Sequence, residues 1–213
     1  MKRIFILAHD YWHHEDTIHP LADLLEKEGY EVIFSTDPKE FTASSPDVLI
    51  SFKDPIENDQ IPTPVWCDED WTDDFMKKVE NGMGFIGVHA MLTDYPENHI
   101  ILKQIVRGTF LRHPHKCPLS VIPVAADHPV MNGVETFQMP DNDEQYFMDM
   151  QETPGTKIIA YTSTEHGEQP AVWVHSYGRG NICCITPGHT KDNIACEGFV
   201  QIIRNAIHWV VRS

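Results

Sequence analysis

An apolar run at residues 82–90 reads Gly82-Met83-Gly84-Phe85-Ile86-Gly87-Val88-His89-Ala90, begins with glycine and runs into a histidine. A run of this kind is typical of a fully buried parallel strand. The strand ends on a pattern of glycine, any residue, a reactive residue and a small residue. This pattern indicates the sharp turn that lifts a side chain above an α/β sheet. In many enzymes of this shape the lifted residue is serine or cysteine. Because it is an imidazole here, the sequence favours acid–base or metal chemistry over covalent acyl transfer.

Strand and helix patterns alternate on the N-terminal side of this run. Short apolar, β-branched segments predict strands, and apolar residues at helical spacing predict amphipathic helices. Their alternation argues for a mostly parallel sheet with helices on both faces. The expected strands are Lys2–Ala8, Tyr30–Ser35 and Asp47–Ser51, the expected helices are Thr17–Glu28 and Trp71–Glu80, and Pro55–Pro64 is expected to be a loop.

The second half of the chain is richer in strand patterns. After a short helix expected over Asn98–Val106, the last two expected strands are joined by a hairpin turn at Tyr177-Gly178-Arg179-Gly180. The chain closes on an amphipathic helix whose apolar residues run from Phe199 to Val210. We therefore expect antiparallel strands to extend the parallel sheet, within one domain over residues 1–213. The expected strands here are Leu119–Val124, Lys157–Thr162, Ala171–His175 and Asn181–Ile185.

The overall composition limits the classes of function. The chain has 213 residues, a formal net charge of −16 and 41% hydrophobic residues, so we expect a globular protein that does not bind nucleic acid. The sequence has no stretch of about 18 apolar residues, which argues against a membrane span. His9 and Asp10 break the apolar start of the chain, so we interpret it as a strand and not as a signal peptide. These features favour a cytoplasmic protein.

Thirteen histidines are the unusual feature of the composition, and three groups of them are expected at one edge of the sheet. His89 ends its strand, His9-Asp10-Tyr11-Trp12-His13-His14-Glu15 follow the first strand, and His189 lies in the turn after a late strand. Ligands of open α/β sheets bind outside the carboxyl ends of the strands. Imidazoles and carboxylates gathered there can hold a divalent metal such as zinc or transfer a proton. The sequence leaves open whether His13 or His14 faces inward.

Further polar side chains come from the acidic segment at residues 141–146. Glu144 and Tyr146 alternate in phase, so both can face one cleft, the first as a base and the second as a hydroxyl donor. His128 precedes a proline in a turn-forming dipeptide, and we expect it to be structural. None of the five cysteines follows a strand in the manner of His89, which argues against a cysteine amidotransferase.

An ordered set of motifs resembles the trehalose-utilisation (ThuA-like) family over nearly the whole chain. The family's fold is that of the class I glutamine amidotransferases, so the resemblance implies a three-layer, flavodoxin-like α/β fold with His89 where amidotransferases keep cysteine. It also implies a catalytic pocket formed by His14, His89, Glu144 and His189, although the first loop only loosely matches the family's Arg-His-Glu. The motifs are Gly84–Ala90, Gly108–Pro114, His128–Val134, Asp143–Tyr146, Pro170–Val174, Tyr177–Gly180, Gly188-His189 and Ile207–Trp209.

The resemblance implies a role in sugar catabolism. We expect an enzyme that isomerises or cleaves a disaccharide or keto-sugar, either by proton transfer between His89 and Glu144 or with a metal held by His14, His89 and His189. Trp12, His113 and Tyr146 are expected to bind this small carbohydrate. The alternative is a non-catalytic carbohydrate-binding or accessory subunit of a sugar dehydrogenase system. A sugar dehydrogenase and a second copy of the chain are therefore the candidate partners.

Overall fold

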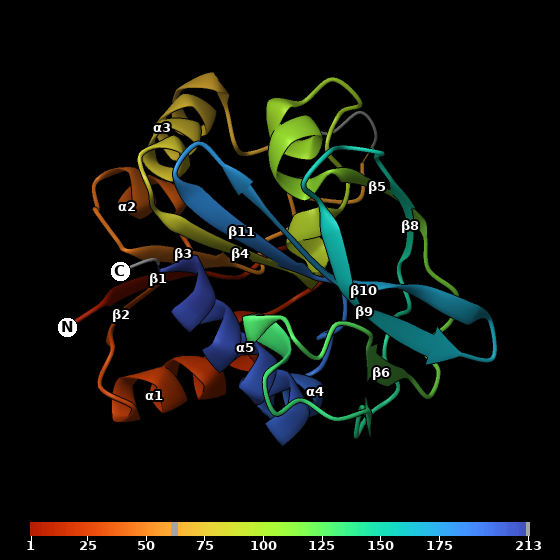
Figure 1. The fold of residues 1–213 in the computed structure, drawn as a ribbon. Helices are drawn as coiled ribbons and strands as arrows, with labels where there is room; N and C mark the ends of the chain where they lie inside the picture. The colour runs from red at the N-terminus through yellow and green to blue at the C-terminus, as the bar shows by residue number, and fades with distance from the viewer. Residues whose placement is uncertain (61–63, 212–213) are drawn as a thin grey trace.

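The computed structural model of the protein describes residues 1–60 and 64–211. Within these residues, nine strands form one large sheet with helices above and below it (Figure 1). The chain therefore has the mixed α/β architecture that its alternating patterns predict. Residues 61–63 of the predicted loop Pro55–Pro64 lie outside the described residues.

Parallel strands make up one half of the large sheet. They are β1 (Arg3–Leu7), β2 (Glu31–Ser35), β3 (Val48–Ser51), β4 (Gly84–Val88) and β11 (Gly180–Ile185). β1 has β2 on one side and β3 on the other, and β4 and β11 continue beyond β3 in the same direction. The apolar run that leads to His89 is thus a buried inner strand, as the sequence predicts.

The other half of the sheet is antiparallel, and the whole sheet has the order β2-β1-β3-β4-β11-β10-β9-β6-β7. β10 and β11 form the predicted hairpin, in which Tyr177 pairs with Gly180. Gly178 has a φ of +56°, and a Cβ there would lie 2.7 Å from the backbone of Glu80, so the turn requires glycine. The bounds are β6 (Ser120–Pro123), β7 (Phe137–Gln138), β9 (Lys157–Thr164) and β10 (Gly167–Tyr177).

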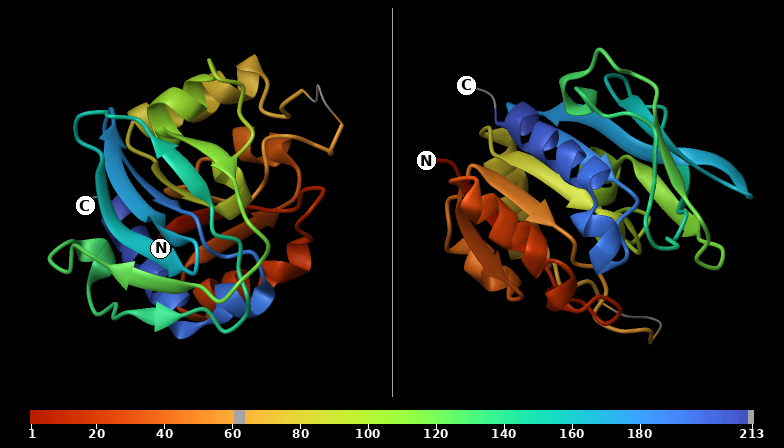
Figure 2. Two further views of the ribbon diagram at one scale, coloured as in Figure 1. Left: turned by 90° about the vertical axis from the view of Figure 1, so that its right-hand side faces the viewer. Right: turned by 90° about the horizontal axis from the view of Figure 1, so that it is seen from below.

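Helices cover both faces of the sheet. One group lies below it in Figure 1 and another lies above it, and the left-hand view of Figure 2 shows the sheet between the two groups. The lower helices are α1 (His19–Lys27), α4 (Lys191–Ala195) and α5 (Glu197–Val210), and the upper ones are α2 (Pro38–Thr42) and α3 (Glu69–Glu80). The predicted closing helix is α5.

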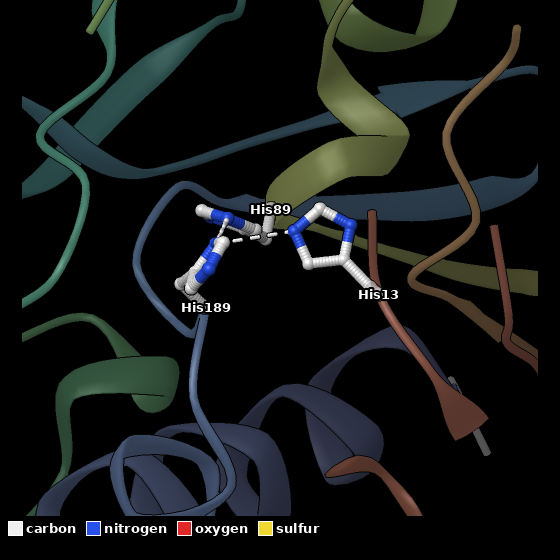
Figure 3. A group of neighbouring side chains, drawn as sticks. All are labelled: His13, His89 and His189. Carbon is white, nitrogen blue, oxygen red and sulfur yellow. Dashed lines mark hydrogen bonds between the residues drawn. The ribbon is translucent and has the colours of Figure 1, made fainter. Parts of the chain in front are cut away.

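One edge of the sheet positions the candidate site. The chain passes from β1 to β2 in one direction along the sheet and from β3 to β4 in the other. Ligands of open α/β sheets bind outside the carboxyl ends of the strands at such a point. Segments that follow β1, β4 and β11 carry His13, His89 and His189, and these three side chains face one another (Figure 3).

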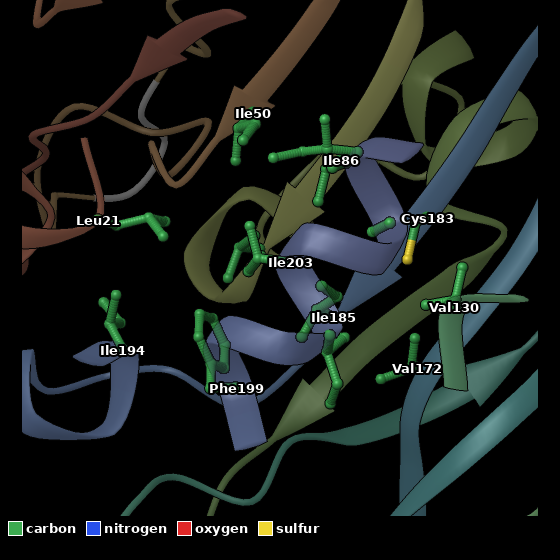
Figure 4. Close-up of a cluster of buried hydrophobic side chains, with 14 of the residues drawn as sticks. Leu21, Ile50, Ile86, Val130, Val172, Cys183, Ile185, Ile194, Phe199 and Ile203 are labelled. Carbon is green, nitrogen blue, oxygen red and sulfur yellow. The ribbon is translucent and has the colours of Figure 1, made fainter. Parts of the chain in front are cut away.

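Two apolar clusters hold the layers together, one on each face of the sheet. Successive side chains of a strand point to opposite faces, so β1 places Ile6 in one cluster and Phe5 in the other. Figure 4 shows the cluster under α5, where Phe199 and Ile203 of the helix share a core with Ile86 of β4.

The structure differs from the sequence patterns at several places. β5 (Gly108–Arg112) and β8 (Phe147–Met150) form a separate antiparallel pair that the patterns do not predict, because β5 is largely exposed. The helix expected from Thr17 begins at His19, since Pro20 is tolerated only in the first turn, and a 3₁₀ turn over Glu15–Thr17 precedes it. The helix expected to end at Val106 is π-helical over Leu102–Val106.

Candidate active site

His89 is the first residue of a 3₁₀ turn (His89–Leu92) that follows β4 directly. Its backbone is left-handed, with a φ of +50°, a conformation that costs a non-glycine residue on the order of 1 kcal/mol and that clusters at functional sites. The residue is only 2% exposed, and its Nδ1 lies 2.8 Å from the carbonyl oxygen of Thr186. Because a carbonyl can only accept, Nδ1 carries a proton, and Nε2 is the nitrogen that faces the site.

His13 comes from the loop after β1 and is held by Asp10. The Asp10 carboxylate lies 2.9 Å from Nδ1 of His13 and also accepts the backbone N–H groups of Trp12 and His13. Burial alone would raise the pKa of Asp10, but the hydrogen bond and charge of His13, with backbone N–H groups, outweigh burial and lower that pKa. An ionised Asp10 accepts the Nδ1 proton, so Nε2 is the nitrogen of His13 that faces the site.

His189 lies in the loop after β11, and Asp143 fixes this loop. The buried Asp143 carboxylate accepts the backbone N–H groups of Gly188 and His189 at 2.9 and 3.2 Å. The backbone of Asp143 also pairs with that of Cys117 in both directions. Asp143 therefore joins three segments of the chain beside the site.

Ring nitrogens of the three histidines converge on one point. Nδ1 of His189 lies 3.1 Å from Nε2 of His13 and 3.1 Å from Nε2 of His89 (Figure 3). One nitrogen from each ring lies within 4.8 Å of the other two. Lys116 is exposed, and its Nζ lies 3.3 Å from the outer nitrogen, Nε2, of His189.

The carboxylate of Glu144 stands beside the convergent nitrogens. Its Oε2 lies 3.2 Å from Nδ1 of His189 and 3.5 Å from Nε2 of His89. Partial burial would raise the pKa of Glu144, but the hydrogen bonds and charges of the two imidazoles outweigh it and hold the pKa well below its usual range. Glu144 is therefore ionised at neutral pH.

Tyr146 closes the inner wall of the site. Its hydroxyl lies 3.0 Å from Nε2 of His89, and its ring stacks on the His89 ring with centroids 4.4 Å apart. Burial raises the pKa of Tyr146 well above its ordinary value, so the phenol keeps its proton and acts as a donor.

A pocket of about 250 Å³ opens in front of these groups. All three residues expected to bind substrate, Trp12, His113 and Tyr146, line it. His113 also contacts Glu144, with 3.8 Å between Nε2 and Oε2. The remaining lining residues are His13, Asp54, Thr93, Asp94, Phe110, Glu144 and His189.

His14 lies outside this cluster, so the first loop contributes His13 and not the predicted His14. The side chain of His14 is 62% exposed, and its ring nitrogens contact Glu15 and Asp16. With His9 and Glu15 it forms a second group of ligand-type side chains on the same loop. The cause is local, because the hydrogen bond to Asp10 holds the His13 ring toward the site.

Sequence reasoning missed Asp54, an acid in the wall of the pocket. It follows β3 at the same edge of the sheet, which is the signal that could have found it. The residue is 4% exposed, and burial raises the pKa of Asp54 to about 8. Its Oδ2 lies 3.0 Å from the hydroxyl of Thr93. Asp54 therefore presents a protonated carboxyl group at neutral pH.

Comparison with known families decides the relationship of the chain. A family model described as trehalose utilisation, ThuA, matches residues 3–210. The chain belongs to the ThuA family. The resemblance drawn from the ordered motifs is thereby confirmed, and ThuA membership associates the protein with sugar metabolism.

Solved structures share the fold of this ThuA-family chain. A ThuA-like protein from Bacteroides uniformis is 19% identical, with a TM-score of 0.75 over 98% of this chain and 90% of that one. One from Parabacteroides merdae is 15% identical, with a TM-score of 0.76 over 99% and 90%. A cytoplasmic protein from Salmonella typhimurium is 12% identical, with a TM-score of 0.65 over 100% of both chains. At these identities the likeness concerns the fold alone.

Two further results complete the comparison. Curated proteins give no match to the sequence. Among residues 1–60 and 64–211, no helix combines the length and the apolar character that crossing a membrane requires.

Proposed function

We propose that this ThuA-family protein is an enzyme that transfers protons on a disaccharide or keto-sugar bound in the pocket. The observation that carries the proposal is that Glu144, Tyr146 and His189 line one small pocket, and that Glu144 and Tyr146 both contact His89. Ligand pockets in proteins usually enclose about 300–1,000 Å³. A volume of about 250 Å³ suits one sugar ring better than a polymer.

Glu144 is the proton acceptor in the proposed reaction. It is ionised at neutral pH and borders the pocket, so it can take a proton from a carbon next to a sugar carbonyl. His89 and His189 lie beside the carboxylate and hold it in place, and Glu144 can return the proton to the neighbouring carbon. Tyr146 keeps its own proton, and its hydroxyl can turn from Nε2 of His89 to donate a hydrogen bond to the carbonyl oxygen. The result is isomerisation, or cleavage where a leaving group lies next to the new carbanion.

The walls of the pocket suit a carbohydrate. Trp12 offers an aromatic face on which the C–H side of a sugar ring can stack, and Phe110 adds further apolar surface. Asp54, Thr93 and His113 supply donors and acceptors for hydroxyl groups. A keto-sugar substrate would be supplied by a sugar dehydrogenase, which makes such an enzyme the proposed partner.

The proposed test measures hydrogen exchange and turnover. Purified protein is incubated in heavy water with disaccharides and their keto derivatives, and NMR follows deuterium incorporation and products. Glu144→Gln keeps the shape of the side chain but removes the base, so we expect a loss of about 10²–10⁴-fold. His14→Ala is the control and should keep full activity. Absence of exchange and turnover with every sugar would overturn the proposal.

The alternative function is a carbohydrate-binding or accessory subunit. It requires that sugars bind in calorimetry while no exchange or turnover occurs, and that Glu144→Gln leaves this affinity nearly unchanged.

We also propose that the sheet and its helices have the flavodoxin-like arrangement of layers. The parallel half has the strand order β2-β1-β3-β4-β11 with helices on both faces, which supports a flavodoxin-like layering because flavodoxin-like sheets have their first strand between the second and the third. A crystal structure that placed all helices on one face would contradict this assignment.

A further inference from the structure

The three rings of the histidine cluster each turn one nitrogen toward the same point. Nδ1 of His89 donates to the Thr186 carbonyl and Nδ1 of His13 donates to Asp10, so Nε2 of each ring faces the cluster. Nδ1 of His189 lies 3.1 Å from both of these nitrogens. One nitrogen of each imidazole is thus directed at the other two rings.

We infer that His13, His89 and His189 form a binding site for a divalent metal ion of the zinc class. Three imidazole nitrogens gathered at one point form a ligand set that suits zinc, because each nitrogen can donate an electron pair to the ion. This inference goes beyond the proposed reaction and does not rest on it, since metal binding is measured without a substrate.

The spacing of the nitrogens agrees with tetrahedral coordination. Imidazole nitrogens bind zinc at about 2.0–2.1 Å, so two ligands of a tetrahedral ion lie about 3.3–3.4 Å apart. Nδ1 of His189 has the other two nitrogens at 3.1 Å, slightly inside this spacing. A small outward movement of the rings would therefore complete the geometry.

The partners behind the rings are those of metal-binding histidines. Such histidines almost always donate their second N–H to a carboxylate or a carbonyl, which orients the ring and makes it a better ligand. Asp10 does so for His13, and the Thr186 carbonyl does so for His89. On His189 the proton would move to Nε2, so the exposed ammonium of Lys116 would turn away into solvent.

The surrounding charge and the open side of the cluster favour a reactive centre. The carboxylates of Asp10 and Glu144 lie against the three imidazoles and attract a cation. Three protein ligands leave one coordination position free, as in catalytic zinc sites. Because His13 and His189 line the pocket, that position faces the space where we place the sugar.

Titration of the full-length, tag-free protein with Zn²⁺ and Co²⁺ tests the inference. The protein is stripped with a chelator, and zinc affinity is measured by competition with a chromogenic chelator. We expect one equivalent of tight binding, and visible absorption bands typical of tetrahedral Co²⁺. His189→Ala removes a ligand and should weaken zinc binding on the order of 100-fold or more. Asp10→Asn should weaken it about 10–100-fold through His13.

Three matched variants keep the test decisive. His14→Ala removes the neighbouring histidine of the exposed group and should leave zinc binding unchanged. Glu144→Gln should keep one equivalent of metal, because we assign Glu144 to proton transfer and not to coordination. Lys116→Met removes a nearby positive charge and should bind zinc at least as tightly as the wild type.

Two results would overturn the metal site. One is a wild-type protein that binds neither ion in stoichiometric amount. The other is zinc binding that survives in His189→Ala but is lost in His14→Ala, which would assign the ion to the exposed group of His9, His14 and Glu15. Circular dichroism of each variant verifies folding. Should exchange on sugars fail while zinc still binds, the proposed reaction is wrong and the metal site stands.

Discussion

Two groups of three ligand-type side chains occur in the part of the chain that the structure describes, and the first loop contributes to both. His13, His89 and His189 form one group, which is largely buried, and His9, His14 and Glu15 form the other, which lies on the surface. The buried group draws its residues from three segments at the ends of three parallel strands. The surface group comes from seven consecutive positions, residues 9–15.

The groups differ in the hydrogen-bond partners that fix their histidines from the side away from the cluster. Asp10 and the Thr186 carbonyl fix His13 and His89 from outside, and Asp143 fixes the loop of His189. The ring nitrogens of His14 contact Glu15, which is half-buried, and Asp16, which is exposed, and both follow it directly in the chain. Outer hydrogen bonds, and not the ligand types themselves, therefore distinguish an organised site from a chance cluster.

The largest contrast is expected in catalysis. His189→Ala removes a group that contacts Glu144, so we expect kcat/KM for the sugar substrate to fall by about 10²–10⁴-fold. His14→Ala should change it by less than about twofold, because an exposed histidine outside the pocket adds no contact to the reaction. Steady-state kinetics measures both. Equal losses in the two variants would remove the distinction between the groups.

The next contrast concerns stability. Asp143→Ala leaves the N–H groups of Gly188 and His189 without their charged acceptor, and such bonds contribute about 1.5–3 kcal/mol each. We expect a loss of about 2–4 kcal/mol in the free energy of unfolding in urea. Asp16→Ala, beside His14, should stay within about 0.5 kcal/mol of the wild type. A neutral Asp143→Ala would mean that the His189 loop is fixed by other contacts.

The third contrast is a pH dependence. Burial raises the pKa of Asp54 to about 8, above the value of about 4 for an unfolded aspartate, so the folded protein binds one more proton between these values. The contribution of Asp54 to stability is therefore complete below pH 4 and falls as pH rises, by up to about 1.4 kcal/mol per pH unit. Asp54→Asn should flatten the curve of unfolding free energy between about pH 4 and pH 8. The exposed Asp59→Asn should leave the curve unchanged, and an equal slope in both variants would contradict the assignment.

The sequence predicted the elements whose patterns are strong. β4 is a continuous apolar run that begins with glycine, the hairpin of β10 and β11 turns at glycine, and α5 carries an apolar stripe at helical spacing. β5 and β8 were not predicted as strands, because β5 exposes most of its residues and its partner strand lies 35 or more positions away in the sequence. α2 was not predicted either, because it is little more than one turn long. Asp37 before Pro38 is a helix start signal that the sequence does contain.

The site was predicted in part. Topology alone places His89, His189 and the loop after β1 at one edge, because parallel strands end together. Sequence spacing does not separate His13 from His14, since the choice depends on how the Asp10 carboxylate turns the loop. Asp54, Asp10 and Asp143 are single acids in an acidic chain, so their roles become visible only through burial and contacts.

Asp143 also links distant parts of the molecule mechanically. Its backbone pairs with that of Cys117, which lies four residues after the pocket residue His113. Its carboxylate accepts a hydrogen bond from the backbone of His189. A displacement of residues 113–117 would therefore be transmitted through Asp143 to the loop that carries His189. We expect sugar binding against His113 to register at His189 as a displacement, so a spectroscopic probe on that imidazole would report occupancy of the outer rim.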